Sequence, residues 1–131
     1  MLCDTDFLVA LLRSNPQAIA ELEQLAQAET VVCTTHLNVC ELFKGAYRSS
    51  NARKAAEAVR KLLDFFTVVP FTLEADEEAG RLLAALQHQG TPIGDIDAII
   101  AAVALTNQET VLTNNVKHFR AAKVNVQGWS S

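Results

Sequence analysis

The sequence lacks the features that mark membrane-spanning and secreted proteins. Half of its 131 residues are hydrophobic, but no stretch approaches the roughly 18 consecutive apolar residues of a membrane-spanning helix. The N-terminus carries no basic segment followed by a long apolar run, because Asp4 and Asp6 come almost at once. Repeats, low-complexity tracts and linkers are also missing. We therefore expect a cytoplasmic protein without membrane association, folded as a single domain over residues 1–131.

Cysteine is scarce and poorly spaced for disulfides or zinc. Cys3, Cys33 and Cys40 are odd in number, form no C-x-x-C pair and stand at no zinc-ligand spacing from a histidine. All three lie among apolar residues, which predicts buried, reduced thiols. The three histidines show no mutual spacing typical of a nucleophilic triad. The sequence thus favours neither a disulfide framework nor a side-chain nucleophile.

Positive charge is scarce overall but concentrated in one segment. Fifteen acidic residues against eleven basic ones give a net charge of −4, which excludes a generally basic nucleic-acid-binding surface. Six of the eleven basic residues nevertheless fall between positions 44 and 61. They can form a cationic face for a polyanion or an ordinary solvated helix face. This basic segment contains Lys44, Arg48, Arg53, Lys54, Arg60 and Lys61.

Short strand-like patterns alternate with longer helical ones. The alternation predicts an α/β fold with a mostly parallel sheet. Capping residues, prolines and apolar periodicity set the expected helix limits. The predicted strands are Met1–Cys3, Thr30–Cys33, Thr67–Val69, Thr110–Leu112 and Val124–Val126. The predicted helices run from about Thr5 to Ser14, Pro16 to Ala28, Thr34 or Thr35 to Tyr47, Ala52 to Phe66, Thr72 towards a loop at Gly90–Pro92, and Asp95 or Asp97 to Thr106.

Four polar residues, Asp4, Glu41, Asp97 and Asn115, stand in or beside apolar segments. An ionised carboxylate is costly there unless it is paired or bound to metal. Asp4 and Asn115 follow predicted strands, and sites in α/β sheets form outside the carboxyl ends of strands. We therefore expect the four side chains to meet in one crevice. Three carboxylates and an amide are typical ligands of Mg²⁺ or Mn²⁺ and indicate phosphate chemistry.

Each of these residues also has a simpler structural explanation. Asp4 can cap the helix that begins near Thr5, and Asp97 can be a first-turn acid. Glu41 can pair with a lysine three residues later on the same helix face. Asn115 can favour a turn. The ligand hypothesis therefore depends on the joint placement of the four.

The motifs resemble those of a known family. Leu2–Leu8 is similar to the first motif of PIN-domain nucleases, a hydrophobic strand, Asp-Thr-Asn/Asp and an apolar helix. Glu41–Gly45 resembles the second motif, Glu-Leu-x-x-Gly, and Gly90–Ala102 the third. Thr113–Phe119 resembles the fourth, and the ending near Trp129 also fits. The likeness spans nearly the whole chain in matching order and is greatest to the VapC-type toxins of type II toxin–antitoxin systems.

The resemblance implies a three-layer α/β/α sandwich with a short, mostly parallel sheet. It also implies an Mg²⁺- or Mn²⁺-dependent endoribonuclease that hydrolyses structured RNA such as tRNA by metal-activated water. A homodimer and a VapB-like antitoxin, whose tail occupies a groove of the toxin, would be its partners. The alternative is a catalytically weak PIN-like module that binds RNA or antitoxin without cutting.

The resemblance further implies roles for individual residues. Asp4, Glu41 and Asp97 would be metal ligands, and Asn115 would complete the catalytic set at a position that is Asp in many PIN domains. Because an amide lowers the negative charge by one, the extra acid Asp95 either restores that charge or caps the last long helix, and we expect the cap. The supporting hydrogen-bonding residues would be Thr5, Asp6 and Thr113.

Basic residues near the crevice are expected to contact RNA phosphates. The candidates are Lys44 and Arg48 in the basic segment and Lys117 in the fourth motif. A haloacid-dehalogenase-like phosphatase is disfavoured, because Leu8 stands where that group has Thr or Val. A response-regulator receiver is also disfavoured, since its phospho-accepting Asp and late Lys are not where required.

Overall fold

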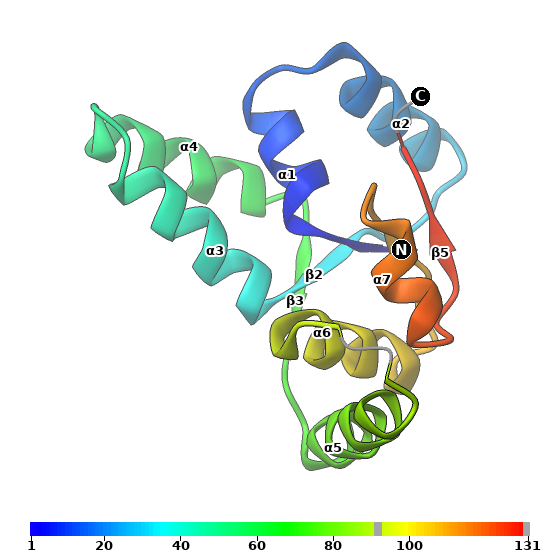
Figure 1. Ribbon diagram of the computed structural model, residues 1–131. Helices are drawn as coiled ribbons and strands as arrows, with labels where there is room; N and C mark the ends of the chain where they lie inside the picture. Colours follow the sequence, from blue (N-terminus) through cyan, green and yellow to red (C-terminus); the bar gives the residue numbers. More distant parts are fainter. Residues whose placement is uncertain (91–92, 130–131) are drawn as a thin grey trace.

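The computed structural model describes residues 1–90 and 93–129, and in them five short strands form one parallel sheet (Figure 1). Its strand order is β3-β2-β1-β4-β5, and every pair is parallel. The α/β prediction is confirmed, although the second and fifth strands begin later than expected. The strands are β1 Leu2–Cys3, β2 Cys33–Thr35, β3 Thr67–Val69, β4 Val111–Leu112 and β5 Val126–Gln127.

Helices cover both faces of the sheet and give three layers. Successive residues of a strand point to opposite faces. Cys3 and Leu112 accordingly pack in one buried cluster with α1–α4, whereas Leu2 and Val111 pack in a second cluster with α5–α7. No helix within the described residues is long and apolar enough to cross a bilayer. The helices are α1 Thr5–Leu12, α2 Pro16–Gln27, α3 His36–Tyr47, α4 Ala52–Leu63, α5 Leu73–His88, α6 Asp95–Thr106 and α7 Val116–Ala121.

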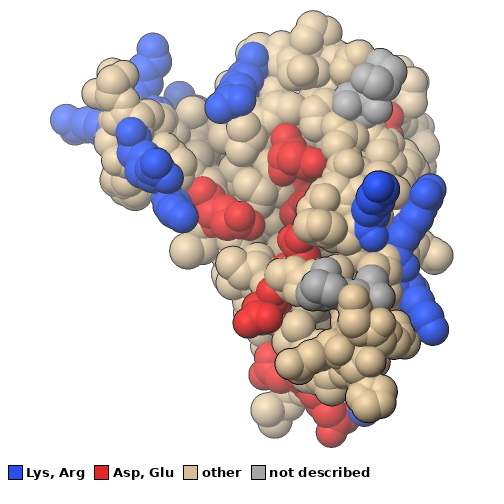
Figure 2. All heavy atoms as spheres, viewed as in Figure 1, with Lys and Arg blue, Asp and Glu red and all other residues tan. Residues whose placement is uncertain are grey.

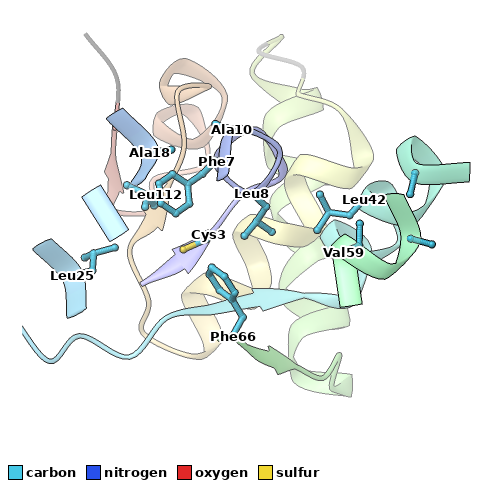
Figure 3. Close-up of a cluster of buried hydrophobic side chains, with 12 residues drawn as sticks. Cys3, Phe7, Leu8, Ala10, Ala18, Leu25, Leu42, Val59, Phe66 and Leu112 are labelled. Atoms are coloured by element: carbon cyan, nitrogen blue, oxygen red, sulfur yellow. The ribbon is translucent and has the colours of Figure 1, made fainter. Parts of the chain in front are cut away.

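The first cluster fixes α1 against the sheet and against the α3–α4 pair. Figure 3 shows Phe7 and Leu8 of α1 among side chains from the sheet and from α3 and α4. Both are fully buried, and burying a side chain of this size stabilises a fold by about 1.5–3 kcal/mol. Because α1 begins directly after β1, this packing also fixes the chain at Asp4 and Thr5.

Several local expectations can be compared with the structure. Thr35 caps α3 and Thr72 caps α5, as the sequence indicated. The short helix α7 was not predicted. The expectation for Cys40 was wrong: it is exposed, because it lies two residues from the buried Asn38 and Leu42 on a helix of 3.6 residues per turn. Thr91 and Pro92 of the expected Gly90–Pro92 loop lie outside the described residues.

The strand order creates a natural site at the centre of the sheet. From the central β1 the chain passes to β2 and β3 on one side and later to β4 and β5 on the other. Ligands of open α/β sheets bind where such connections diverge, outside the carboxyl ends of the strands. Asp4 follows β1 and Thr113 follows β4, and the pairing of Cys3 with Leu112 puts them level with each other.

Candidate functional site

Asp4 is the buried centre of the site. Only 7% of it is exposed, and its Oδ2 accepts a hydrogen bond from Thr113 Oγ1 at 2.9 Å while its Oδ1 accepts one from Asn38 Nδ2 at 2.9 Å. Burial raises the pKa of the Asp4 carboxyl, and these two hydrogen bonds oppose the increase. The residue occupies the N-cap position of α1, but its side chain makes no capping hydrogen bond. The capping explanation is therefore wrong.

Asn38 connects Asp4 to α3 and was not singled out from the sequence. It is fully buried. Its Nδ2 donates to Asp4 Oδ1 and to Thr5 Oγ1, both at 2.9 Å, and its Oδ1 accepts from Thr35 Oγ1 at 2.6 Å. A signal for it exists: Asn38 is the third residue after the cap Thr35 and the third before Glu41, so it shares a helix face with that acid.

Glu41 is connected to the Asp4 network by a hydrogen bond from the Thr5 hydroxyl. Its Oε1 accepts a hydrogen bond of 3.0 Å from Thr5 Oγ1, the same hydroxyl that accepts from Asn38. No ion pair joins Glu41 to Lys44 in the part of the chain that the structure describes. Glu41 is an exposed residue. Its carboxylate is therefore oriented towards the end of β1 without being buried.

Asp6 ties three segments together. Its Oδ2 accepts from the backbone N–H of Asn114 at 2.8 Å and from Thr113 Oγ1 at 3.2 Å, and its Oδ1 accepts from Trp129 Nε1 at 3.4 Å. The Trp129 ring also meets Phe7 edge-on, with 5.6 Å between ring centroids. Both oxygens of the Asp6 carboxylate thus accept hydrogen bonds from protein donors, which suits a supporting residue better than a metal ligand.

Asp97, Asn115 and His118 form a second group at the same edge of the sheet. Asp97 lies in the first turn of α6, and Asn115 and His118 lie at the start of α7. Asp97 Oδ2 is 2.9 Å from His118 Nδ1 and 3.4 Å from Asn115 Nδ2. Asn115 Nδ2 is 2.9 Å from His118 Nδ1. The side chains of Asp97 and His118 are 24% and 48% exposed, so this group is open to solvent.

Thr113 joins the two groups into one network. Its buried hydroxyl has one proton to share between Asp4 Oδ2 at 2.9 Å and Asp6 Oδ2 at 3.2 Å, and it accepts from the backbone N–H of Asn115 at 3.0 Å. The structure therefore brings all four positions of the sequence hypothesis onto one hydrogen-bond network. His118 and Asn38 are the members that the motif comparison missed. The spacing of His118 fits neither a nucleophilic triad nor a zinc site, and its position three residues after Asn115 is the informative feature.

Asp95 lies outside this network. The N-cap of α6 is Gly94 and no side chain caps that helix, so the expected cap at Asp95 is wrong. The Asp95 side chain is exposed and lines a different pocket, with Leu83 and Leu86 of α5 and with Ile93. The acid is one residue too late in the helix to act as the cap, because a capping side chain must precede the first helical residue.

The oxygen atoms of this network are of the kind that binds a hard cation, but they are not arranged as a complete coordination shell. Among the described residues, no three Asp, Glu, His or Cys side chains gather as a ready-made metal site. The network instead alternates the carboxylates of Asp4, Glu41 and Asp97 with amides and hydroxyls. Carboxylate and amide oxygens are the ligands that Mg²⁺ and Mn²⁺ accept. A nearby cation would also favour the ionised form of Asp4, which burial disfavours.

Charge is arranged around the site rather than uniformly. In the face shown in Figure 2, acidic side chains form a band through the middle of the molecule, with basic side chains over the α3–α4 pair on one side and near α7 on the other. Lys44 and Arg48 at the end of α3 and Lys117 in α7 are exposed. Such an arrangement suits a polyanion whose backbone crosses an acidic centre between two cationic flanks.

Known proteins are similar to this chain along nearly its whole length. Residues 1–124 match the PIN domain family. The chain is 31% identical over 129 residues to Ribonuclease VapC1 of Haemophilus influenzae strain R2866, which covers 97% of this chain and 96% of that protein. It is 25% identical over 128 residues to the tRNA(fMet)-specific endonuclease VapC of Shigella flexneri, with 97% and 96% covered.

Solved structures show the same fold. VapBC-1 from nontypeable Haemophilus influenzae superposes with a TM-score of 0.88 at 27% identity, covering 99% of this chain and 98% of that one. VapBC2 from Rickettsia felis, bound to a DNA fragment from its promoter, gives 0.90 at 23% identity with 98% of each chain covered. The three-layer prediction is confirmed by this likeness. The chain belongs to the PIN domain family and, within it, is a relative of the VapC ribonucleases.

Proposed function

We propose that this protein is a metal-dependent endoribonuclease that acts as the toxin of a toxin–antitoxin pair. The observation that carries the proposal is the continuous network joining Asp4, Glu41, Asp97 and Asn115 at the carboxyl edge of β1 and β4. Relatives along nearly the whole chain are named VapC ribonucleases. The reaction is hydrolysis: water supplies the new oxygen on phosphorus, and the bond between phosphorus and the leaving ribose oxygen breaks.

In this proposal Asp4, Glu41 and Asp97 hold Mg²⁺ or Mn²⁺. When bound, such an ion polarises a phosphate oxygen and makes water more acidic. The protein's own contribution is orientation. Asn38 and Thr113 hold the Asp4 carboxylate between them, and the distances of 2.9 Å fix the direction of both oxygens. Thr5 holds the Glu41 carboxylate, and Asp6 and Thr113 keep the end of β4 beside α1.

The substrate of this proposal is structured RNA such as tRNA. A Shigella flexneri relative is named a tRNA(fMet)-specific endonuclease. Lys44 and Arg48 at the end of α3 and Lys117 in α7 are exposed, and in this proposal they contact phosphates on either side of the cleaved bond. The overall negative charge limits binding to unrelated polyanions. An enzyme with this substrate acts in the cytoplasm.

The proposed partners are a VapB-like antitoxin and a second copy of the chain. Structural neighbours are VapBC complexes. A largely apolar groove between α1, α3 and α4 runs beside Glu41, lined by residues such as Val9, Leu12, Leu42 and Val59. An antitoxin tail in this groove would lie next to the carboxylate network and could block it. The groove is therefore the place where we propose that the inhibitor binds.

The test is cleavage of purified tRNA by metal-free protein after addition of Mn²⁺ or Mg²⁺. We expect cleavage that a chelator stops and that Asp97→Asn lacks, with the cut ends mapped by sequencing. Asp95→Asn is the matched control, because Asp95 lies on the same helix but outside the network. Cleavage that resists the chelator would refute the proposal.

A second function, a module that binds RNA or antitoxin without cutting, has one observation in its favour. The carboxylates do not form a ready-made metal cage among the described residues. Calorimetric titration with Mn²⁺, followed by an assay of turnover on the same sample, separates the two functions. Metal or RNA binding without turnover would favour the binding module.

A further inference from the structure

His118 is placed as a member of the site, not as a bystander. Its Nδ1 is 2.9 Å from Asp97 Oδ2 and 2.9 Å from Asn115 Nδ2, and those two atoms are 3.4 Å apart. Three polar atoms from three side chains thus form a small triangle at the solvent-accessible end of the network. One of the three comes from α6 and the other two from the start of α7.

Two sides of this triangle, both 2.9 Å and both ending at His118 Nδ1, match the edge of an octahedral metal site, whereas the third side is 3.4 Å. Ligand atoms about 2.1 Å from a cation and at right angles to each other are about 3 Å apart. Asp97 Oδ2 and His118 Nδ1 already have this separation. The Asn115 amide presents its nitrogen to both neighbours, and a half-turn about its last side-chain bond would present the oxygen instead.

We propose that His118 Nδ1 is a ligand of the same ion that Asp97 holds, and that it directs the site towards Mn²⁺ over Mg²⁺. This inference rests on the proposed function, since it assumes that Asp97 is a metal ligand. Imidazole nitrogen suits transition-metal ions, whereas Mg²⁺ prefers oxygen ligands and retained waters. The neutral Asn115 leaves the site one charge short of an all-acidic set, and a neutral imidazole adds a donor without adding charge.

A purely electrostatic role for His118 predicts the opposite result. If the imidazole were only a cation paired with Asp97, it would compete with a metal ion for that carboxylate. Removing it would then strengthen metal binding. An exposed ion pair of this kind also contributes little to stability. The sign of the change in metal affinity therefore distinguishes a ligand from a competitor.

The experiment compares wild type, His118→Gln and Asp97→Asn by calorimetric titration of the metal-free protein with Mn²⁺ and with Mg²⁺. We expect His118→Gln to weaken Mn²⁺ binding about tenfold while Mg²⁺ binding changes much less. His88→Gln is the matched control, because His88 ends α5 and is absent from the network. Pulsed electron paramagnetic resonance of bound Mn²⁺ should show an imidazole nitrogen signal in wild type that is lost in His118→Gln.

Two outcomes would overturn the inference. Mn²⁺ bound without an imidazole nitrogen signal, or Mn²⁺ binding that is unchanged or tighter in His118→Gln, would remove His118 from the ligand set while leaving the nuclease proposal intact. If wild type binds neither ion, or Asp97→Asn binds both ions as wild type does, the proposed metal site at Asp97 fails as well.

Discussion

The two halves of the network differ in how firmly the fold holds them. Asp4 is almost fully buried and each of its oxygens accepts a hydrogen bond from a fully buried donor, Asn38 or Thr113. Asp97 and His118 are partly exposed, and their contacts are mainly with each other and with Asn115. The buried half is set by the strand ends and the core. The open half depends on side chains that can rearrange around a ligand.

The difference in burial between Asp4 and the Asp97–His118 pair affects the stability of their charged forms. Burial raises the pKa of the Asp4 carboxyl, because a buried site disfavours the charged form, and the hydrogen bonds from Thr113 and Asn38 oppose this increase. A cation bound beside Asp4, as proposed, would favour the charged form of this carboxyl. In the open half, the side chains of Asp97 and His118 are partly exposed, so solvent screens their interaction. We therefore expect substitutions in the buried half to change stability and activity together, and substitutions in the open half to change mainly ion binding.

The largest effect is expected from Asp4→Asn. Cleavage should fall to about a thousandth of wild type or less, since one of the proposed metal ligands is lost. The metal-free variant should nevertheless melt at a higher temperature at pH 7, because a disfavoured buried charge is removed. The new amide can accept from Asn38 and donate to Thr113, whose own proton can go to Asp6.

Activity assays and thermal unfolding of the metal-free proteins check both parts. Asp64→Asn, an exposed acid at the end of α4, is the control for removing a charge as such. A lower melting temperature for Asp4→Asn, with Asp64→Asn unchanged, would show that the buried half is not under electrostatic tension.

Asn38→Ala should have the next largest effect. It leaves Asp4 Oδ1 unpaired and removes half of the capping box of α3, which together should lower the free energy of unfolding by about 2–4 kcal/mol. Asn51→Ala is the matched control, because Asn51 caps α4 away from the site and should cost only about 1 kcal/mol. Urea unfolding measures both. Equal losses in the two variants would mean that the bond to Asp4 contributes nothing.

Smaller changes, in RNA affinity, are expected at the basic residues Lys44 and Arg48 at the end of α3. Lys44→Ala or Arg48→Ala should weaken RNA binding and reduce the salt dependence of log K by about one phosphate contact each. Lys61→Ala serves for comparison, since Lys61 belongs to the same basic segment but pairs with Glu57 at 3.6 Å. Binding measured across a salt series gives the slopes. If log K depends on salt concentration with the same slope in wild type, Lys44→Ala and Arg48→Ala, these two residues do not belong to the RNA interface.

The last prediction concerns the reactivity of the three cysteine thiols, and we expect no change in function from it. At pH 8, iodoacetamide should alkylate Cys40 in the folded protein and spare Cys3 and Cys33, because burial protects these two and raises the pKa of Cys33 to about 11. Mass spectrometry before and after denaturation counts the modified thiols. Rapid alkylation of Cys33 in the folded state would indicate that β2 opens more readily than its buried position implies.

The sequence was most informative where one residue determines a local feature. Thr35 and Thr72 predicted helix starts because side-chain caps are local interactions. The placement of Asp4 and Asn115 after strands predicted that both lie at one edge of the sheet, where Thr113 links them. Strand limits were predicted less well: β2 begins at Cys33, since pairing with β1 and β3 decides which residues of the apolar run are hydrogen-bonded.

The site partners could be predicted only in part, because they depend on distant contacts. Asn38 meets Asp4 across 34 positions and His118 meets Asp97 across 21. Neither pair has a local pattern that fixes it. Cys40 was misjudged because apolar neighbours in sequence do not specify which side of α3 a residue faces. These contacts and orientations are determined by packing between segments that are distant in the sequence.

The most direct test of the central claim is the single-turnover rate of tRNA cleavage as a function of Mn²⁺ concentration. We expect a rate that is zero without metal, that saturates with the affinity measured by calorimetry and that is lost in both Asp4→Asn and Asp97→Asn. Cleavage that is independent of Mn²⁺, or that persists in Asp97→Asn at the wild-type rate, would contradict a metal-dependent site built from the two halves of this network.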